Sequence, residues 1–139
     1  MRSDDVQTIA PESMLGDVES YRLSPGLACG DLIFLSGQIG FEADGTLPSD
    51  PARQAELAFA RVAAVLAEAG GSLNDVLAIT SYHVGRFWEA EQWFRPVVES
   101  VFSAPYPAWT SVEVAGLAVP EAVLEVTTVA RRSAAPPHQ

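Results

Sequence analysis

Short apolar runs alternate with stretches of helical spacing along the middle of the chain. Runs rich in β-branched and aromatic residues, bounded by turn signals, predict strands over residues 32–39, 76–84, 108–115 and 123–131. The Asp44-Gly45 pair marks a turn after the first of these runs. The sequence therefore predicts strands that are separated in the chain and must meet in one sheet.

The first helical stretch has both of its ends marked. Asp50 followed by Pro51 is typical of a helix start, because proline fits the first helical position without losing a needed hydrogen bond. Gly70 and Gly71 are typical of a helix end. Four apolar residues recur at helical spacing and predict one buried face: Ala55, Phe59, Val62 and Leu66.

A second helical stretch lies over residues 88–102. It places Trp93, Val97 and Val101 in one row, and Pro96 inside it is expected to kink the helix or to start a new turn. The order is then strand or strands, helix, strand, helix, strand, strand. This order predicts an α+β fold in which the helices cover one side of a sheet.

The two ends of the chain lack such patterns. We expect residues 1–18 to form a loose arm, residues 19–132 a single domain, and residues 133–139 a disordered tail with an inert His138. The chain shows neither a secretory signal nor an apolar run of the roughly 18 residues that span a bilayer. We therefore expect a cytoplasmic protein with no membrane partner.

Alternation along each strand divides its side chains between two sheet faces. The aliphatic sets are expected to face the helices: Ile33, Leu35 and Ile39, Val112 and Val114, and Leu124, Val126 and Thr128. The other face would carry Phe34, Trp109, Val123 and Val129 among the polar side chains of Ser36, Gln38, Ser111, Glu113 and Glu125. Two helices cover only one side of a small sheet, so a second apolar face predicts contact with another subunit. The alternative is an ordinary amphipathic sheet with solvated polar groups.

The charged residues exclude several classes of chemistry. The 139 residues include 18 acidic and 8 basic side chains, all eight basic residues are arginine, and the formal charge is −10. Without lysine the chain forms no Schiff base and no P-loop. The acidic balance also argues against nucleic acid and anionic membranes as partners. With one cysteine and one histidine in the patterned region, we expect no metal site.

Three sequence blocks resemble those of the RidA family, also called YjgF, of reactive intermediate/imine deaminases. They are GDLIFLSGQIG at residues 30–40, PAWTSVEVAGL at 107–117 and LEVTTVARR at 124–132. The helices between the blocks follow the same order, so the resemblance covers about residues 21–132. It implies a chorismate-mutase-like mixed sheet with two helices on one face and a homotrimer with three clefts between subunits. It also implies hydrolysis of enamines and imines to ketones and ammonia without a cofactor.

The resemblance also assigns residues to the cleft. It implies that Glu125 and Ser36 retain the acid and the serine of the family, whereas Trp109 replaces the arginine that binds the substrate carboxylate. Leu23 stands at the position of a family tyrosine, and Arg95 at that of an asparagine. The tryptophan offers one hydrogen-bond donor where arginine offers five, so a simple 2-imino acid is not the expected substrate.

Glu125 and Ser36 are the catalytic candidates. A carboxylate in a partly closed cleft has a raised pKa, which suits proton transfer near neutral pH. The alternative is a Glu125 paired with Arg131 or Arg132. Ser36 would orient water or substrate, and its alternative is a hydrogen bond to the backbone.

The substrate-binding candidates are Trp109, Tyr106, Arg95, Leu23 and Gln38. Trp109 would line the pocket for an apolar, aromatic or cationic group, or merely fill space. Tyr106 would line the same mouth, and Arg95 would supply a positive charge from another direction. For Gln38 a structural role is the stronger interpretation.

Three further residues carry weaker hypotheses. His83 titrates near neutral pH and would serve as a base, although a lone strand histidine is more often packed in a core. Glu113 is expected to make a hydrogen bond between subunits, and Cys29 to be a small filler in a loop.

Three functions follow from these features. The first is a divergent Rid-type enzyme that hydrolyses or tautomerises an enamine, an imine or a related reactive small molecule. The second is a non-catalytic trimeric protein that binds a small ligand or acts like a chaperone. The third, disfavoured by the charge, is an endoribonuclease.

Overall fold

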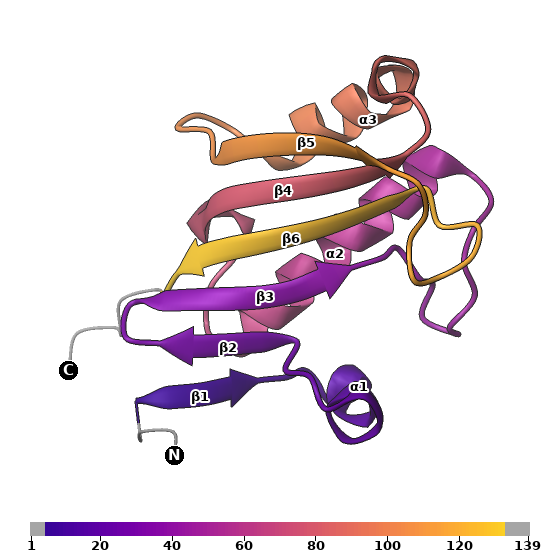
Figure 1. Cartoon of the computed structure of the whole chain (residues 1–139). Helices are drawn as coiled ribbons and strands as arrows, with labels where there is room; N and C mark the ends of the chain where they lie inside the picture. Colours follow the sequence, from indigo (N-terminus) through magenta and orange to yellow (C-terminus); the bar gives the residue numbers. More distant parts are fainter. Residues whose placement is uncertain (1–4, 133–139) are drawn as a thin grey trace.

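The computed structural model describes residues 5–132 and consists of one sheet covered on one side by two helices (Figure 1). The strands are β1 (Val6–Ile9), β2 (Gly26–Cys29), β3 (Leu32–Gln38), β4 (Val76–Val84), β5 (Ala108–Val114) and β6 (Leu124–Arg131). They lie in the order β1-β2-β3-β6-β4-β5, and every adjacent pair is antiparallel except the parallel β4 and β5. The predicted mixed α+β sheet is confirmed.

The two covering helices also follow the prediction closely. α2 (Pro51–Glu68) begins directly after Asp50, with proline in its first turn. α3 (Phe87–Val101) is one helix that contains Pro96, so the proline does not divide the stretch in two. Both helices lie behind the sheet in Figure 1 and leave the near face of the sheet free of helices.

The N-terminal segment is ordered where the structure describes it, so the expected loose arm is wrong from Val6 onward. β1 pairs with β2, and a 3₁₀ turn (Glu12–Met14) leads into the short helix α1 (Leu15–Tyr21). Ile9 and Met14 are almost completely buried in the core. Two isolated apolar residues produce no detectable period, which is why the pattern missed this packing. The tail at 133–139, with His138, lies outside the described residues.

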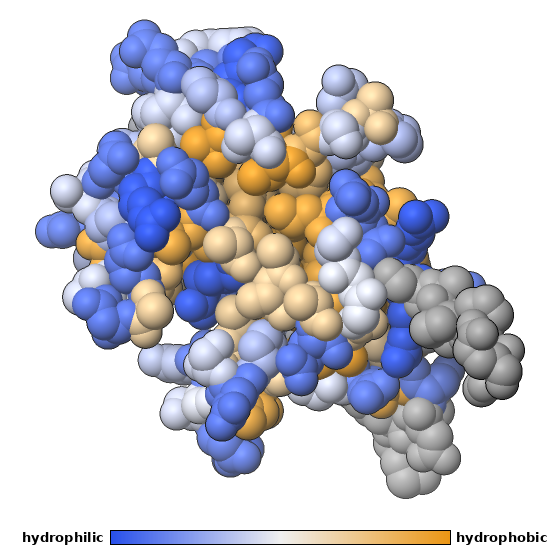
Figure 2. All heavy atoms as spheres, turned by 180° about the vertical axis from the view of Figure 1, so that it is seen from behind, coloured by the Kyte–Doolittle hydropathy of each residue, from blue (hydrophilic) through white to orange (hydrophobic). Residues whose placement is uncertain are grey.

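The core lies between the sheet and α2, and Phe59 is at its centre. All four residues of the predicted α2 face are fully buried. The Phe59 ring contacts three aromatic rings, with centroid distances of 6.3 Å to Phe94, 5.4 Å to Phe102 and 6.2 Å to Trp109. Seen from the helix side, apolar residues gather across the middle of the molecule and hydrophilic residues lie toward its edges (Figure 2).

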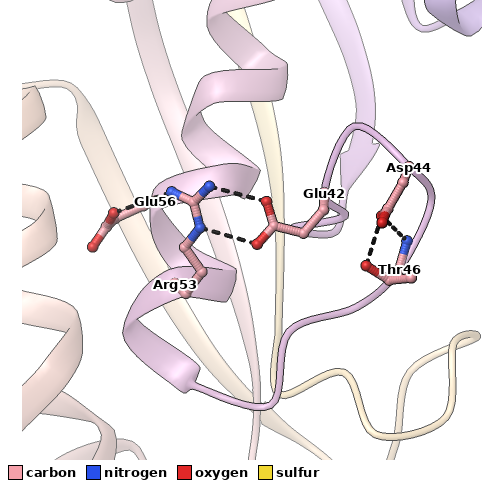
Figure 3. A network of polar contacts seen from close by, with 5 residues as sticks. All are labelled: Glu42, Asp44, Thr46, Arg53 and Glu56. Atoms are coloured by element: carbon pink, nitrogen blue, oxygen red, sulfur yellow. Dashed lines mark hydrogen bonds and ion pairs between the residues drawn. The ribbon is translucent and has the colours of Figure 1, made fainter.

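Buried Gln54 fixes the start of α2 to the loop directly before it and to a loop far along the chain. Its Nε2 donates to the Pro48 carbonyl at 2.9 Å, and its Oε1 accepts from the Val123 backbone N–H at 2.9 Å. Gly40 passes so close that an added Cβ would lie 2.0 Å from the Gln54 carbonyl oxygen. Nearby, the Arg53 guanidinium binds the carboxylates of Glu42 and Glu56 (Figure 3). These contacts set where β3 ends and β6 begins.

The assignment of β5 to the two sheet faces is wrong. Trp109, Ser111 and Glu113 lie on the helix side, and Val112 lies on the open side, 37% exposed. The bulky indole packs against Phe59 and fills the corner beside α3, which the smaller Val112 would leave partly empty. Size rather than aliphatic character decided which set is buried.

Two smaller expectations near β3 are also corrected. An irregularity in the pairing of β3 with β6 between Leu35 and Gln38 interrupts the alternation. Gln38 is consequently buried, and its Oε1 accepts a hydrogen bond from Arg61 Nε of α2 at 3.0 Å. Cys29 is exposed at the end of β2 rather than in a loop.

Candidate functional site

Glu125 lies on the open face of the sheet, in register with Tyr82 of β4. Burial raises the pKa of its carboxyl above the ordinary value. Within residues 5–132 this carboxyl has no hydrogen bond or ion pair. Arg131 instead binds Asp75 at 3.1 Å, and Arg132 binds Gln7 at 3.2 Å. The expected alternative, a Glu125 paired with either arginine, is therefore not what the structure shows.

The Glu125 carboxyl rests against the backbone of Gly37. A Cβ added at Gly37 would lie 2.8 Å from Cδ of Glu125 and 3.0 Å from both carboxyl oxygens. Any other residue there would force the carboxyl to move. Gly37 is not among the candidate residues that the sequence pattern indicates. The signal was present, because a glycine inside a strand often marks a close approach.

Ser36 precedes Gly37, and its hydroxyl donates to the Ser24 carbonyl at 2.7 Å. This is the backbone hydrogen bond expected as the alternative to a catalytic role. The bond fixes the hydroxyl and leaves its oxygen as an acceptor. Ser36 also lines a hollow of about 520 Å³ in the open face, together with Thr8, Arg22, Ser24, Leu27 and Phe34. Leu23 is absent from the lining of this hollow and lies beside the adjoining one.

Trp109 lies partly buried beside a different hollow, between β5 and α3. Its Nε1 donates to the Ser81 hydroxyl at 3.0 Å, so the indole N–H is already bonded within the chain. The hollow has a volume of about 280 Å³, and Phe87, Phe94, Val98 and Ser111 contribute to its lining. Trp109 therefore both fills the corner of the core and forms the wall of this hollow.

Arg95 and Tyr106 lie near Trp109 at the same edge of the sheet. Arg95 forms an ion pair with Glu91, one turn earlier in α3. Glu99 lines the same hollow, so the carboxylates there outnumber the one guanidinium. Tyr106 is 74% exposed and lines a neighbouring hollow of about 550 Å³ that also includes Trp109. This edge offers aromatic surface with no excess of positive charge.

His83 belongs to the core. Its Nε2 lies 2.8 Å from the Ser81 hydroxyl, and its ring is edge-on to Phe87 and Phe94 at centroid distances of 5.0 and 4.9 Å. Burial lowers the pKa of His83, which Glu113 and Glu91 partly oppose. Glu113 itself accepts a hydrogen bond from the Phe87 backbone N–H at 2.8 Å. The packed-core interpretation of His83 fits these contacts better than a catalytic one.

The candidate residues thus fall into two groups on one chain. Glu125, Gly37 and Ser36 lie on the open face at β3 and β6. Trp109, Arg95 and Tyr106 lie at the β5 edge on the helix side. β4 separates β6 from β5, so a single chain does not bring the two groups into one cleft.

Comparisons with known proteins decide the family. A sequence profile described as Endoribonuclease L-PSP matches residues 18–132. The chain is 40% identical to RutC family protein YjgH of Escherichia coli (strain K12) over 102 residues, which cover 70% of this chain and 75% of YjgH. The chain belongs to the YjgF/RidA family. This Rid-family chain also has 32% identity to TdcF of the same strain over 113 residues, covering 78% of the chain and 85% of TdcF. TdcF carries the provisional name reactive intermediate deaminase.

Solved structures agree with this assignment. A structure of YjgH aligns with a TM-score of 0.80 and 33% identity, over 91% of this chain and 96% of that one. The structure of E. coli TdcF with bound serine aligns with a TM-score of 0.69 and 28% identity, over 80% of this chain and 88% of TdcF. Family membership and these names support a general role in imine-related small-molecule chemistry. No helix within residues 5–132 is long and apolar enough to cross a membrane.

Proposed function

We propose that the chain is a divergent Rid-type enzyme that hydrolyses or tautomerises an imine, an enamine or a related reactive small molecule. The observation that carries the proposal is the environment of the Glu125 carboxyl. Burial raises the pKa of this carboxyl, which lies against Gly37 at the open sheet face. A carboxyl with a raised pKa takes and returns protons near neutral pH more readily than a solvated one.

The proposed hydrolysis uses Glu125 twice. The carboxylate removes a proton from water as the water oxygen bonds to the C=N carbon. The protonated carboxyl returns this proton to the nitrogen, which gives a carbinolamine. The carboxylate then removes the hydroxyl proton of the carbinolamine and passes it to the nitrogen as the C–N bond breaks, so a ketone and ammonia leave. An enamine would first take a proton on carbon from the same group. Every proton is accounted for, and the reaction needs no cofactor.

The cleft is proposed to close only in a homotrimer. The open sheet face bears exposed apolar side chains, including Phe34 at 47% and Val112 at 37% exposure, which favour contact with another copy. Such a contact would bring the Trp109 edge of one subunit toward the Glu125 face of the next.

The substrate is proposed to differ from a simple 2-imino acid. Trp109 stands where the family resemblance places a carboxylate-binding arginine, and its N–H is bonded to Ser81. Arg95 is paired with Glu91, and we propose that it does not replace that arginine. A carboxylate next to the C=N bond would lack a partner at this edge of the cleft, at a cost of several kcal/mol.

The family profile also carries a ribonuclease name, which we do not adopt as the function. RNA binding depends on clustered positive charge. This chain has a formal charge of −10 and no lysine.

The test is Glu125→Gln, with imines generated in situ by amine and amino-acid oxidases as substrates and ketone formation as the readout. We expect kcat/KM to fall by about 10²- to 10⁴-fold, the usual contribution of a general acid–base group. Glu113→Gln, which removes a carboxylate from the helix side, is the matched control and should retain activity. Unchanged kcat/KM in Glu125→Gln would refute the assigned role. Ligand binding without turnover by wild type would favour the non-catalytic alternative.

A further inference from the structure

Most arginines of the described chain are already bound by other side chains. Arg53 binds Glu42 and Glu56 (Figure 3), Arg95 binds Glu91, and Arg131 binds Asp75. The side chains of Arg61 and Arg132 donate to Gln38 and Gln7. Within residues 5–132, only Arg22 and Arg86 have no hydrogen bond from the side chain and no ion pair.

Arg22 lines the hollow that also contains Ser36. Thr8, Ser24 and Ser36 contribute three hydroxyl groups to this hollow, and Leu27 and Phe34 contribute an apolar surface. The Thr8 and Ser24 hydroxyls lie 2.9 Å apart and share one hydrogen bond, and the Ser36 hydroxyl donates to the Ser24 backbone carbonyl. One hydroxyl hydrogen of the Thr8–Ser24 pair therefore remains to donate, and a guanidinium beside such a donor suits an anion.

The backbone of Arg22 supports a role for its side chain. Arg22 ends α1 in the left-handed conformation (φ 54°, ψ 42°), with its N–H bonded to the Val18 carbonyl. That conformation costs a residue with a Cβ about 1 kcal/mol and is usually taken by glycine. Fold stability alone gives no reason for an arginine here. Glu19 lines the adjoining hollow but forms no ion pair with Arg22.

The hollow belongs to the same sheet face as Glu125. Thr8, Leu27, Phe34 and Val129 pair in register across four neighbouring strands. Val129 and Glu125 are four residues apart on β6, so they point to the same side. Ser36 of the hollow directly precedes Gly37, which the Glu125 carboxyl contacts. β3 lies between β2 and β6, so these two strands are about two strand spacings, roughly 10 Å, apart. Arg22 lies four residues before β2, and Glu125 lies on β6.

We propose that Arg22 binds the carboxylate of the substrate, at a point several atoms away from the carbon that reacts beside Glu125. The ligand is an imino acid, or the oxo acid that it forms, whose carboxylate and C=N or C=O carbon are separated by a short chain lying along β3 beside Ser36. This inference rests on the proposed function, because it identifies the substrate class of the same face. It also explains how a chain of strongly negative charge attracts an anion without an arginine at position 109.

The test measures equilibrium binding of defined probes by calorimetry. The probes are 5-oxohexanoate, its uncharged amide, the short acid 2-oxobutyrate, and inorganic phosphate. The variants are Arg22→Gln, Arg22→Lys and, as the matched control, Arg86→Gln, which removes the same charge at the exposed start of α3. Thermal unfolding of each variant verifies that it is folded.

We expect wild type to bind 5-oxohexanoate more tightly than its amide or 2-oxobutyrate. Arg22→Gln should weaken binding of the long acid by about 10-fold or more, with little effect on the amide, because a charge-assisted hydrogen bond is lost. Arg22→Lys should retain part of the affinity, and Arg86→Gln nearly all of it.

Several outcomes would overturn the inference. These are equal binding of acid and amide by wild type, equal losses in Arg22→Gln and Arg86→Gln, or tighter binding of 2-oxobutyrate or phosphate than of the long acid. Because no turnover is needed, the result is separable from the proposed function. Arg22-dependent binding without turnover supports the inference and refutes the enzyme. Turnover that requires Glu125 but is unchanged in Arg22→Gln supports the enzyme and refutes the inference about Arg22.

Discussion

His83 and Glu125 are close neighbours in the sheet and have opposite surroundings. His83 pairs in register with Leu124, and the adjacent pair is Tyr82 with Glu125. One step along the strands places His83 under the helices, 1% exposed, and Glu125 on the open face. Burial disfavours the charged form of both groups, so it lowers the pKa of His83 and raises the pKa of Glu125.

The difference between them lies in access and partners. His83 is enclosed by Phe87 and Phe94 and bonded to Ser81, so its neutral form completes the core. The Glu125 carboxyl has backbone on one side and the open sheet face on the other. A shifted pKa therefore indicates chemistry only where a substrate can arrive, and the helix-covered face excludes substrate from His83.

The largest expected effect is on the free energy of unfolding, when one phenylalanine on each face of the sheet is replaced by alanine in separate variants. Phe59→Ala should lower the free energy of unfolding by about 3–5 kcal/mol, because it empties the centre of the core. Phe34→Ala should change the unfolding of the isolated chain little and should weaken the proposed trimer. Denaturant unfolding and sedimentation velocity measure the two effects. An intact trimer in Phe34→Ala would argue that the open face is not an interface.

The next largest effect is expected at Gly37. Gly37→Ala introduces a Cβ that displaces the Glu125 carboxyl, so kcat/KM should fall by about 10- to 100-fold while the fold is retained. Gly16→Ala is the control, because an added Cβ there meets nothing within 4 Å. Wild-type activity in Gly37→Ala would mean that the position of the carboxyl is unimportant.

A smaller effect is expected at Ser36. Ser36→Ala removes one hydrogen bond to Ser24, which is worth about 1 kcal/mol, so kcat/KM should fall several-fold. The comparison is Ser100→Ala, which removes a similar hydroxyl-to-carbonyl bond within α3. A loss above 100-fold at Ser36 would instead indicate direct participation in the chemistry.

The smallest expected effect is on the pH dependence of stability, to which His83 and Glu125 contribute with opposite signs. The folded chain binds a proton at His83 more weakly than the unfolded chain does. The free energy of unfolding therefore decreases as pH falls below about 6.5. His83→Phe should flatten that loss. Glu125 acts oppositely, because its raised pKa costs stability as pH rises above about 4.5. Glu125→Gln should therefore be somewhat more stable than wild type at neutral pH. Thermal unfolding between pH 4.5 and 7 tests both signs.

The regular elements and the family were accessible from the sequence, and the exceptions have identifiable causes. α2 and β4 follow from strong local periods, since burial on one face repeats along the chain. Gln38 was assigned to the wrong side because an irregularity in strand pairing is invisible to a simple alternation. β1 was missed because Val6–Ile9 is short and has a single buried residue, Ile9, so it shows no alternation before it pairs with β2.

The candidate site likewise contains residues that the sequence identified and residues that only the structure identified. Glu125 and Ser36 were identified from their sequence blocks, because each stands inside a run that resembles the family. Gly37 and Arg22 were not. The role of Gly37 depends on an approach from β6, and that of Arg22 on a hollow that β1, β2 and β3 line together.

The sequence by itself determined the order of strands and helices, the family, and a tryptophan at position 109, where the resemblance places an arginine. These depend on residue identity and local spacing. Only the tertiary structure decided that Trp109 packs inward and that, among residues 5–132, Glu125 stands unpaired against Gly37 and Arg22 is unpaired beside Ser36. Strand pairing and side-chain size fix those relations between distant residues, and no local pattern records them.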